Sequence, residues 1–388
     1  MCISTSFYVC IENIYKFESK MNIAFFYLGQ QGGGAALDTL EMAVGLSHYA
    51  KVLCVVSSTS DSFHRWINES ERNQSLNVIG LKTSKRPLKA LLGLINVPVN
   101  YNMINKINEF KPDVIYSHMG HPYESVLIPF VKSKIKARGI HDVKIHEGEM
   151  TLYQRFASLF FRYRATHYVV FSDFSFKEMI KNGVQSDKIL TTFLGCNTML
   201  LKDRNLDVTH YNRFLFFGRL IKYKGIDVLF HSLESVFKEF PTSKLVIAGR
   251  GDISAYATLV EKFRNNLDIY NEWIDDNDVP HFFKDIDFVV APYTNATQSG
   301  VVLLSYSFGK PVIVSDSGGL PEQVNEGVTG LVVPTGNSDA LSEAIIKMLK
   351  YKEHLSEMKK CAFDKSMELT WEAAAKKLYE QFDIVLKN

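Results

Sequence analysis

The chain has few of the features that indicate a secreted, metal-binding or membrane-spanning protein. Its 388 residues contain five cysteines, an odd number without the spacing of a metal site, which favours a reducing cytoplasm over a disulfide framework. No window approaches the roughly 18 continuous apolar residues of a membrane span. Charged residues also interrupt positions 1–20, so these do not read as a signal peptide. Internal repeats and low-complexity tracts are absent as well.

The length and composition indicate a globular protein of two domains. One hydrophobic core rarely serves 388 residues, and 46% hydrophobic with 22% charged residues is ordinary for a folded chain. The net charge of +2 hides an asymmetry, because Lys and Arg outnumber Asp and Glu by 22 to 16 up to residue 196 and are outnumbered by 22 to 26 after it. A basic first half could lie on an anionic membrane or bind an acidic acceptor, and scattered solvated lysines would give the same count.

Short apolar runs alternate with longer helical patterns through the whole chain, which predicts two doubly wound α/β domains with parallel sheets. Met21 stands directly before the first convincing strand, so we set residues 1–20 apart as an extension. We expect an N-terminal domain at 21–196, a polar linker at 197–212 and a C-terminal domain at 213–388, whose last helix packs back toward the first domain. The predicted strands are 23–28, 52–57, 114–117, 136–140, 167–171 and 189–193 in the first domain, and 214–217, 245–248, 267–270, 288–291, 312–314 and 330–333 in the second.

The segment 214–225, F-L-F-F-G-R-L-I-K-Y-K-G, is the most informative part of the sequence. It places Gly218, Arg219 and Lys224 just beyond an apolar strand. Two cations beside a glycine turn suit a diphosphate. Two later loops, at 298–304 and 308–322, contain glycine and open probable helices, whose free N–H groups attract anions. These features together predict a nucleotide-sugar site.

The same residues resemble the group 1 glycosyltransferases, glycosyltransferase family 4, which have the two-domain GT-B architecture. The resemblance is strongest over 214–336 and weaker over 21–193. It implies a retaining hexosyltransferase in which Arg219, Lys224 and His141 serve the reaction. The donor-binding residues that it implies are Gly33, Gly34, Gly218, Gly249, Trp273, Ile274, Gln298, Ser299, Gly300, Val301, Gly318, Gly319 and Glu322. Among them, Gly318, Gly319 and Glu322 match the family's G-G-x-x-E element, and Trp273 and Ile274 lie where the resemblance places the nucleobase.

One departure from the family pattern concerns two glutamates of the donor loop. The aligned positions here are Ala296 and Leu304, and neither side chain is a carboxylate. In the family the second glutamate holds the ribose hydroxyls and the first lies near the anomeric carbon. The departure motivates an alternative from another class, a GT-B subunit that binds a nucleotide or glycan without turnover.

The acceptor side is read from basic residues beside bulky apolar ones, at 82–95 and 155–164. Lys85 and Arg86 are the candidates there, and packed amphipathic helices would show the same pattern. Glu149 is a separate candidate for an acceptor-side carboxylate or base, and a charge at a helix N-terminus is its alternative role. The acceptor expected from this reading is a lipid-linked oligosaccharide in surface polysaccharide synthesis. The enzyme would then lie in the cytoplasm, on the inner face of the membrane.

No cofactor, metal or nucleic acid partner is expected. The donor is a substrate, with UDP as the expected nucleotide. The histidines at 118, 121 and 146 lack metal-site spacing, so we assign them structural roles. The segment D-I-D at 285–287 resembles the metal-binding pair of the other glycosyltransferase fold, but it leads into a predicted buried strand, so we assign it a structural role as well. A dinucleotide oxidoreductase is a third alternative, but residues 30–34 lack the full G-x-G-x-x-G pattern and no acidic ribose partner is evident about twenty residues later.

Overall fold

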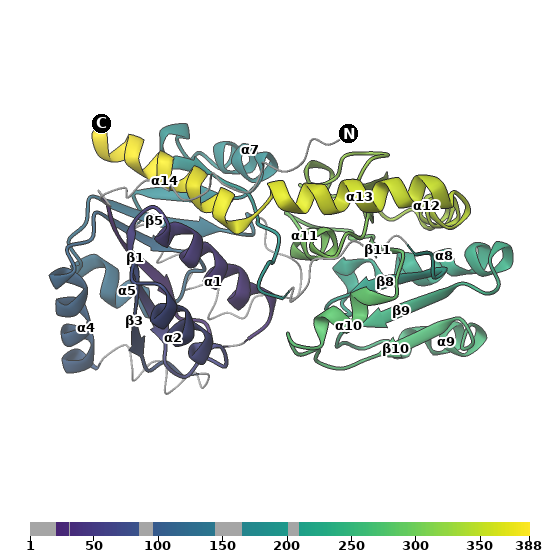
Figure 1. The fold of residues 1–388 in the computed structure, drawn as a ribbon, viewed down its shortest axis with the longest axis horizontal. Helices are drawn as coiled ribbons and strands as arrows, with labels where there is room; N and C mark the ends of the chain where they lie inside the picture. Colours follow the sequence, from purple (N-terminus) through teal and green to yellow (C-terminus); the bar gives the residue numbers. More distant parts are fainter. Residues whose placement is uncertain (1–20, 31, 85–95, 144–164, 201–208) are drawn as a thin grey trace, which may run out of the picture.

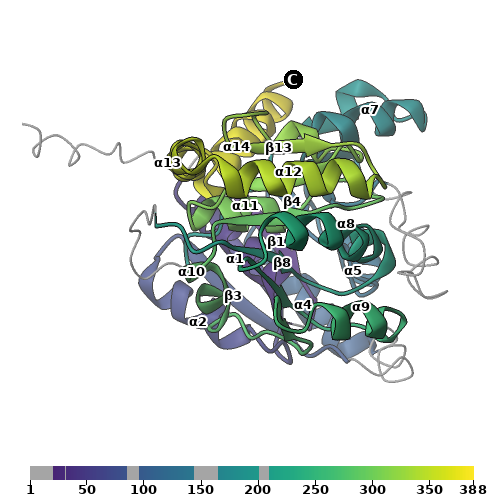
Figure 2. The ribbon, with the colours of Figure 1, turned by 90° about the vertical axis from the view of Figure 1, so that its right-hand side faces the viewer.

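The computed structural model describes residues 21–30, 32–84, 96–143, 165–200 and 209–388. These ranges form two parallel sheets, one of seven strands in the order β3-β2-β1-β4-β5-β6-β7 and one of six in the order β10-β9-β8-β11-β12-β13. The two lobes lie side by side in Figure 1, and Figure 2 shows the second lobe in front of the first. The prediction of two doubly wound α/β domains with parallel sheets is confirmed.

The first lobe follows the alternation of strands and helices in the sequence. Its strands are β1 (Asn22–Tyr27), β2 (Lys51–Ser57), β3 (Leu76–Leu81), β4 (Val114–Ser117), β5 (Ile135–Ile140), β6 (His167–Val170) and β7 (Ile189–Thr191). Its helices are α1 (Gly34–Ser47), α2 (Phe63–Arg72), α4 (Val97–Glu109), α5 (Glu124–Leu127) and α7 (Asp173–Lys181).

The second lobe repeats this plan with a smaller sheet. Its strands are β8 (Arg213–Phe217), β9 (Lys244–Ala248), β10 (Leu267–Tyr270), β11 (Phe288–Ala291), β12 (Val312–Ser315) and β13 (Gly330–Val333). Its helices are α8 (Ile226–Glu239), α9 (Ala257–Lys262), α10 (Val279–Lys284), α11 (Gly300–Ser307), α12 (Ser338–Lys350) and α13 (Lys352–Glu368), and α14 (Trp371–Lys387) follows.

The sequence analysis missed one strand, β3. Its residues L-N-V-I-G-L pair with β2 alone, at the edge of the sheet, and only Leu76 and Leu81 are buried. An edge strand needs few apolar side chains, so the continuous hydrophobic run that marks the central strands is absent there. The other twelve strands lie where the apolar runs predict them, with ends that differ by one or two residues.

Helix α14 returns to the first lobe and packs along α1, while α13 lies over the second (Figure 1). A Cβ at Gly45 of α1 would lie 2.8 Å from Cβ of Ala375, so the two helices approach closely only because position 45 is glycine. Trp371 is buried, and Gln381 accepts from the Thr191 amide at 2.8 Å. The end of the chain is therefore part of the first lobe's core.

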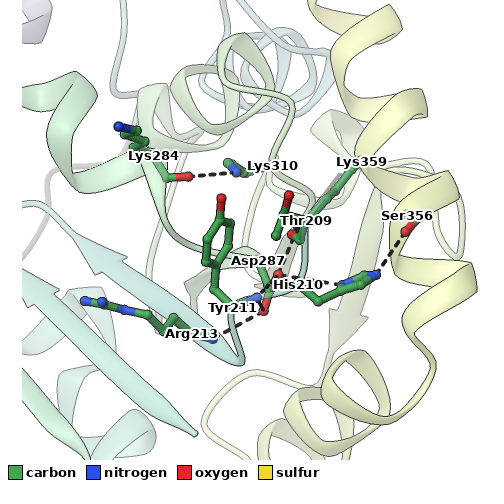
Figure 3. A network of polar contacts seen from close by, with 9 residues as sticks. All are labelled: Thr209, His210, Tyr211, Arg213, Lys284, Asp287, Lys310, Ser356 and Lys359. Atoms are coloured by element: carbon green, nitrogen blue, oxygen red, sulfur yellow. Dashed lines mark hydrogen bonds and ion pairs between the residues drawn. The ribbon is translucent and has the colours of Figure 1, made fainter. Parts of the chain in front are cut away.

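The start of the second lobe is fixed by a buried ion pair (Figure 3). Nζ of Lys359, in α13, lies 2.9 Å from Oδ1 of Asp287, and both side chains are almost fully buried. Asp287 also accepts from the amides of Tyr211 and Arg213, at 3.1 and 3.2 Å. The acidic residue at 287 therefore has a structural role, in agreement with the sequence interpretation.

Candidate active site

The carboxyl ends of β8 and β9 open onto a cleft between the lobes. Loops and turns that follow parallel strands gather at this edge of a sheet, the usual place for ligands in α/β folds. The cleft has a volume of about 740 Å³ including its open mouth. It is lined by Gly33, Gly34, Asn197, Leu200, Phe217, Gly218, Arg219, Ala248, Gly249, Arg250, Glu272, Trp273, Ile274, Asp276, Val279 and Leu304.

Two of the predicted glycines allow the turns after β8 and β9 to touch. Gly218 and Gly249 have φ of 113° and 145°, values that other residues rarely adopt. A Cβ at Gly249 would lie only 1.9 Å from the carbonyl oxygen of Gly218. A side chain at position 249 would therefore separate the two turns that form the cleft wall.

The two predicted cations differ in their position. Arg219 lines the cleft, and its guanidinium donates to the Tyr223 hydroxyl at 3.0 Å. Lys224 is outside the lining residues, and its Nζ lies 3.9 Å from the centre of the Tyr293 ring. The Tyr293 hydroxyl accepts from Ser299 Oγ at 3.2 Å, so Lys224 is close to the loop that leads into α11.

The loop before α11 is held by Gln323. Its side chain accepts from the Ser299 amide at 2.8 Å and donates to the Ser299 carbonyl at 3.1 Å. Helix α11 begins at Gly300, so its first amides, including those of Gly300 and Val301, are at the amino end that the sequence analysis assigned to the diphosphate. Ala296 and Leu304 are both buried, and Leu304 also lines the cleft.

The G-G-x-x-E element lies where the lobes meet rather than along the cleft lining. Gly318 has φ of 56°, and a Cβ there would lie 1.7 Å from the Ala296 carbonyl oxygen. The Gly319 amide donates to the Thr297 carbonyl at 3.2 Å. Glu322 accepts from the Asp173 amide, at the start of α7 in the first lobe, at 2.8 Å. In this structure the element is hydrogen-bonded to the donor loop through Gly319 and to the first lobe through Glu322.

His141 directly follows β5 and belongs to a buried aromatic cluster. Its ring stacks on Phe171 at 4.3 Å, and its Nε2 lies 3.2 Å from the His118 carbonyl. Burial lowers the pKa of His141 to about 4, so the imidazole is neutral at pH 7. Its carbonyl accepts from Gln298 Nε2 at 3.3 Å, which brings His141 next to the predicted donor loop.

The segment after β10 reaches across the mouth of the cleft. Trp273 is 58% exposed, and a Cβ at Gly33 would lie 3.3 Å from its ring. Arg65 of the first lobe forms an ion pair with Asp276 at 2.7 Å. Trp273 and Ile274, which the sequence analysis assigned to the nucleobase, therefore line the cleft opposite the glycine loop of the first lobe.

Two residues of the site had no place in the sequence analysis. Asp38 accepts from Asn197 Nδ2 at 2.8 Å, and burial raises the pKa of Asp38 to about 7. Asn197 lines the cleft. The spacing of four between Gly34 and Asp38 was a readable signal, because residues four apart share one face of a helix. The partnership with Asn197 spans 159 positions and could not be read.

The weak acceptor-side candidates Lys85, Arg86 and Glu149 lie outside the described residues. Within the described ranges, no helix is long and apolar enough to cross a membrane. Among those same residues, no three or more His, Cys, Asp or Glu side chains are grouped to hold a metal ion.

The fold is that of GT-B glycosyltransferases. HepE of Anabaena, solved in complex with UDP and glucose, superimposes with a TM-score of 0.72 at 17% identity over 94% of this chain and 100% of that one. Residues 211–351 match the family model described as glycosyl transferases group 1. The predicted resemblance to group 1 glycosyltransferases is thus confirmed, by a match that covers most of the second lobe.

Curated relatives agree with this assignment over part of their length. YtcC of Bacillus subtilis, named as a glycosyltransferase, is 31% identical over 185 residues, 44% of this chain and 45% of that protein. The phosphatidyl-myo-inositol mannosyltransferase of Mycobacterium leprae is 32% identical over 142 residues, 35% of this chain and 37% of that protein. The chain therefore matches less than half the length of these two relatives.

Proposed function

We propose that this protein is a retaining glycosyltransferase of family 4. It would move a sugar from a nucleotide diphosphate sugar, with UDP as the expected nucleotide, to a lipid-linked oligosaccharide in surface polysaccharide synthesis. The observation that carries the proposal is the cleft that contains Arg219, at the end of β8, opposite Gly33 and Gly34 of the other lobe. The cleft is large enough for a small-molecule ligand.

The chemistry follows from where positive charge lies. Breaking a sugar–diphosphate bond builds negative charge on the departing phosphate, and fixed cations near that phosphate lower the barrier. Arg219 and Lys224 would supply this charge, and the first amides of α11 would add neutral donors. The acceptor hydroxyl would attack from the face that the diphosphate leaves, with the diphosphate as base. Neutral His141 would contact the transferred sugar.

The acceptor assignment rests on two kinds of support. The first half of the chain is basic by six charges, from 22 Lys and Arg against 16 Asp and Glu. The Mycobacterium leprae relative is named for phosphatidyl-myo-inositol, a lipid. Both favour a membrane-held acceptor and peripheral attachment to the inner face of the cytoplasmic membrane.

The alternative is a catalytically silent subunit, which the apolar residues at the two glutamate positions favour. The side chains of Ala296 and Leu304 are both buried and apolar, so neither can take over the role of a carboxylate. A silent subunit would still bind a nucleoside diphosphate. Binding without sugar release or transfer would therefore identify it.

Thermal-shift measurements with UDP, GDP, ADP and their sugars, followed by sugar-release and lipid-acceptor assays, test the proposal. Arg219→Ala or Lys224→Ala should lower turnover by about 10²–10³-fold while the melting temperature stays near that of the wild type. Lys222→Ala is the matched control, since Lys222 is exposed on the same turn and has no assigned role. Near-normal turnover in both variants would contradict the diphosphate assignment.

A further inference from the structure

The resemblance to the family implies two glutamates in the donor loop, and this chain has Ala296 and Leu304 at those positions. Leu304 lines the second-lobe wall of the cleft, and Ala296 is buried in the same hydrophobic cluster. Donor hydroxyls that enter such a cleft must find acceptors, because a polar group left without a partner on desolvation costs binding free energy. Within the donor loop, Thr297 Oγ1 and Gln298 Oε1 are neutral oxygen atoms that could accept, so a carboxylate would have to come from another element.

Asp38 of α1 faces this wall from the first lobe. It is one helical turn after Gly34, which lines the cleft, and so lies on the same face of α1. A Cβ at Gly300 would lie 3.9 Å from its Oδ2. Gly300 and Leu304 are in turn one helical turn apart on α11. The carboxyl group is therefore beside the α11 face that lacks one.

Asn197 fixes the orientation of this carboxyl group. Its Nδ2 donates to Oδ1 of Asp38 at 2.8 Å, and Asn197 itself lines the cleft together with Gly34 and Leu304. The amide thereby holds one carboxyl oxygen, while Oδ2 is the oxygen near Gly300. A carboxylate with one oxygen anchored is well suited to accept from a hydroxyl with the other.

Other acidic side chains near the cleft are less suited to this role. Asp276 is paired with Arg65 at 2.7 Å, and Glu41 accepts from the amides of Thr198 and Met199. Glu272 lines the cleft but is exposed and adjoins Trp273 at the predicted nucleobase wall. It is the competing candidate for the experiment.

We propose that Asp38, oriented by Asn197, binds hydroxyl groups of the nucleotide sugar and supplies from the first lobe the carboxylate that Ala296 and Leu304 cannot. The inference rests on the proposed function, because it assumes a nucleotide sugar in this cleft. The hydroxyls belong either to the ribose, which UDP, GDP and ADP share, or to the transferred sugar. A carboxyl group kept in an environment that disfavours its charge agrees with a binding role.

Isothermal titration calorimetry of the full chain tests this inference. UDP, GDP and ADP are titrated first, and the nucleotide that binds the wild type is then compared with its 2′-deoxy form and its glucose conjugate. Asp38→Asn should weaken binding at least tenfold. A ribose contact is shown if the wild type binds the 2′-deoxy form more weakly than the ribose form, while Asp38→Asn binds the two forms equally. A sugar contact is shown if Asp38→Asn weakens only the glucose conjugate.

Two further variants keep the outcome decisive. Asn197→Ala should weaken binding less than Asp38→Asn does, because it removes only the orienting hydrogen bond. Glu272→Gln should weaken binding by less than Asp38→Asn does. Binding by Asp38→Asn within twofold of the wild type for all ligands, or a loss that follows Glu272→Gln instead, would overturn the inference alone. A wild type that binds none of the three nucleotides would overturn the proposed function as well.

Discussion

Replacing Asp38 by Asn should stabilise the unliganded protein above pH 7. Burial raises the pKa of this carboxyl group from its ordinary value of 3.8 to about 7, against the opposing hydrogen bond from Asn197. Between these two values the native state binds a proton that the unfolded chain has lost. The free energy of unfolding of the wild type therefore falls as pH rises from about 4 to about 7, and the loss is complete above that. Asparagine has the same shape and does not titrate.

The expected gain follows from the difference in pKa. A rise from 3.8 to about 7 corresponds to about 4 kcal/mol at about 1.4 kcal/mol per pH unit, an upper bound because the residue keeps some contact with water. We expect Asp38→Asn to be about 2–4 kcal/mol more stable than the wild type at pH 8 and equal to it near pH 4.

Urea unfolding from pH 4.5 to 8, followed by tryptophan fluorescence, is the assay. Trp66 and Trp371 are buried in the first lobe and report its unfolding. Burial also raises the pKa of Glu41 and Glu124. Glu124 is common to the two proteins and cancels in their difference, whereas the repulsion between Glu41 and Asp38 is part of the difference that is measured. A difference between variant and wild type that stays constant from pH 4.5 to 8 would refute the reasoning.

Three further predictions concern the buried ion pair of Lys359 with Asp287, the conformation of Gly318 and the protonation state of His141. Lys359→Met should cost about 3–5 kcal/mol of second-lobe stability because it leaves Asp287 buried and unpaired, and adding Asp287→Asn should cost less than the sum of the single changes in urea unfolding. Gly318→Ala should lower stability by about 1–3 kcal/mol, since φ is 56° and the new Cβ would meet the Ala296 carbonyl at 1.7 Å; an unchanged melting temperature would contradict this. Because burial holds the pKa of His141 at about 4, His141 should cause no inflection near pH 6.5 in the pH profile of kcat/KM. The wild type and His141→Gln should therefore have profiles of the same shape around that pH.

Much of the fold could be read from the sequence because its central strands are buried on both faces. Such strands are continuous apolar runs, as in β8 and β11, and the helices between them set the parallel order. The edge strand β3 lacks this signal because only its end residues are buried. The apolar pattern of a sequence depends on burial, so a strand with few buried side chains, such as β3, leaves little signal for prediction.

The candidate site could be predicted only where a local motif carries the chemistry. Gly218, Arg219 and Gly249 follow strands directly, and the structure brings them together at one cleft. The hydrogen bond of Glu322 to Asp173 joins residues 149 positions apart. Contacts of this kind depend on how the lobes meet, which local spacing does not encode.

The position of Asp38 has a consequence for how a donor would be held. Arg219 belongs to the second lobe and Asp38 to the first, so a nucleotide sugar bound to both would connect the lobes directly. With both glutamates of the family pattern, the donor's hydroxyl and phosphate contacts would lie on one lobe. Here Ala296 and Leu304 supply no carboxylate from the donor loop of the second lobe. Donor affinity should then depend on the contacts that keep the lobes together, among them the ion pair of Arg65 with Asp276.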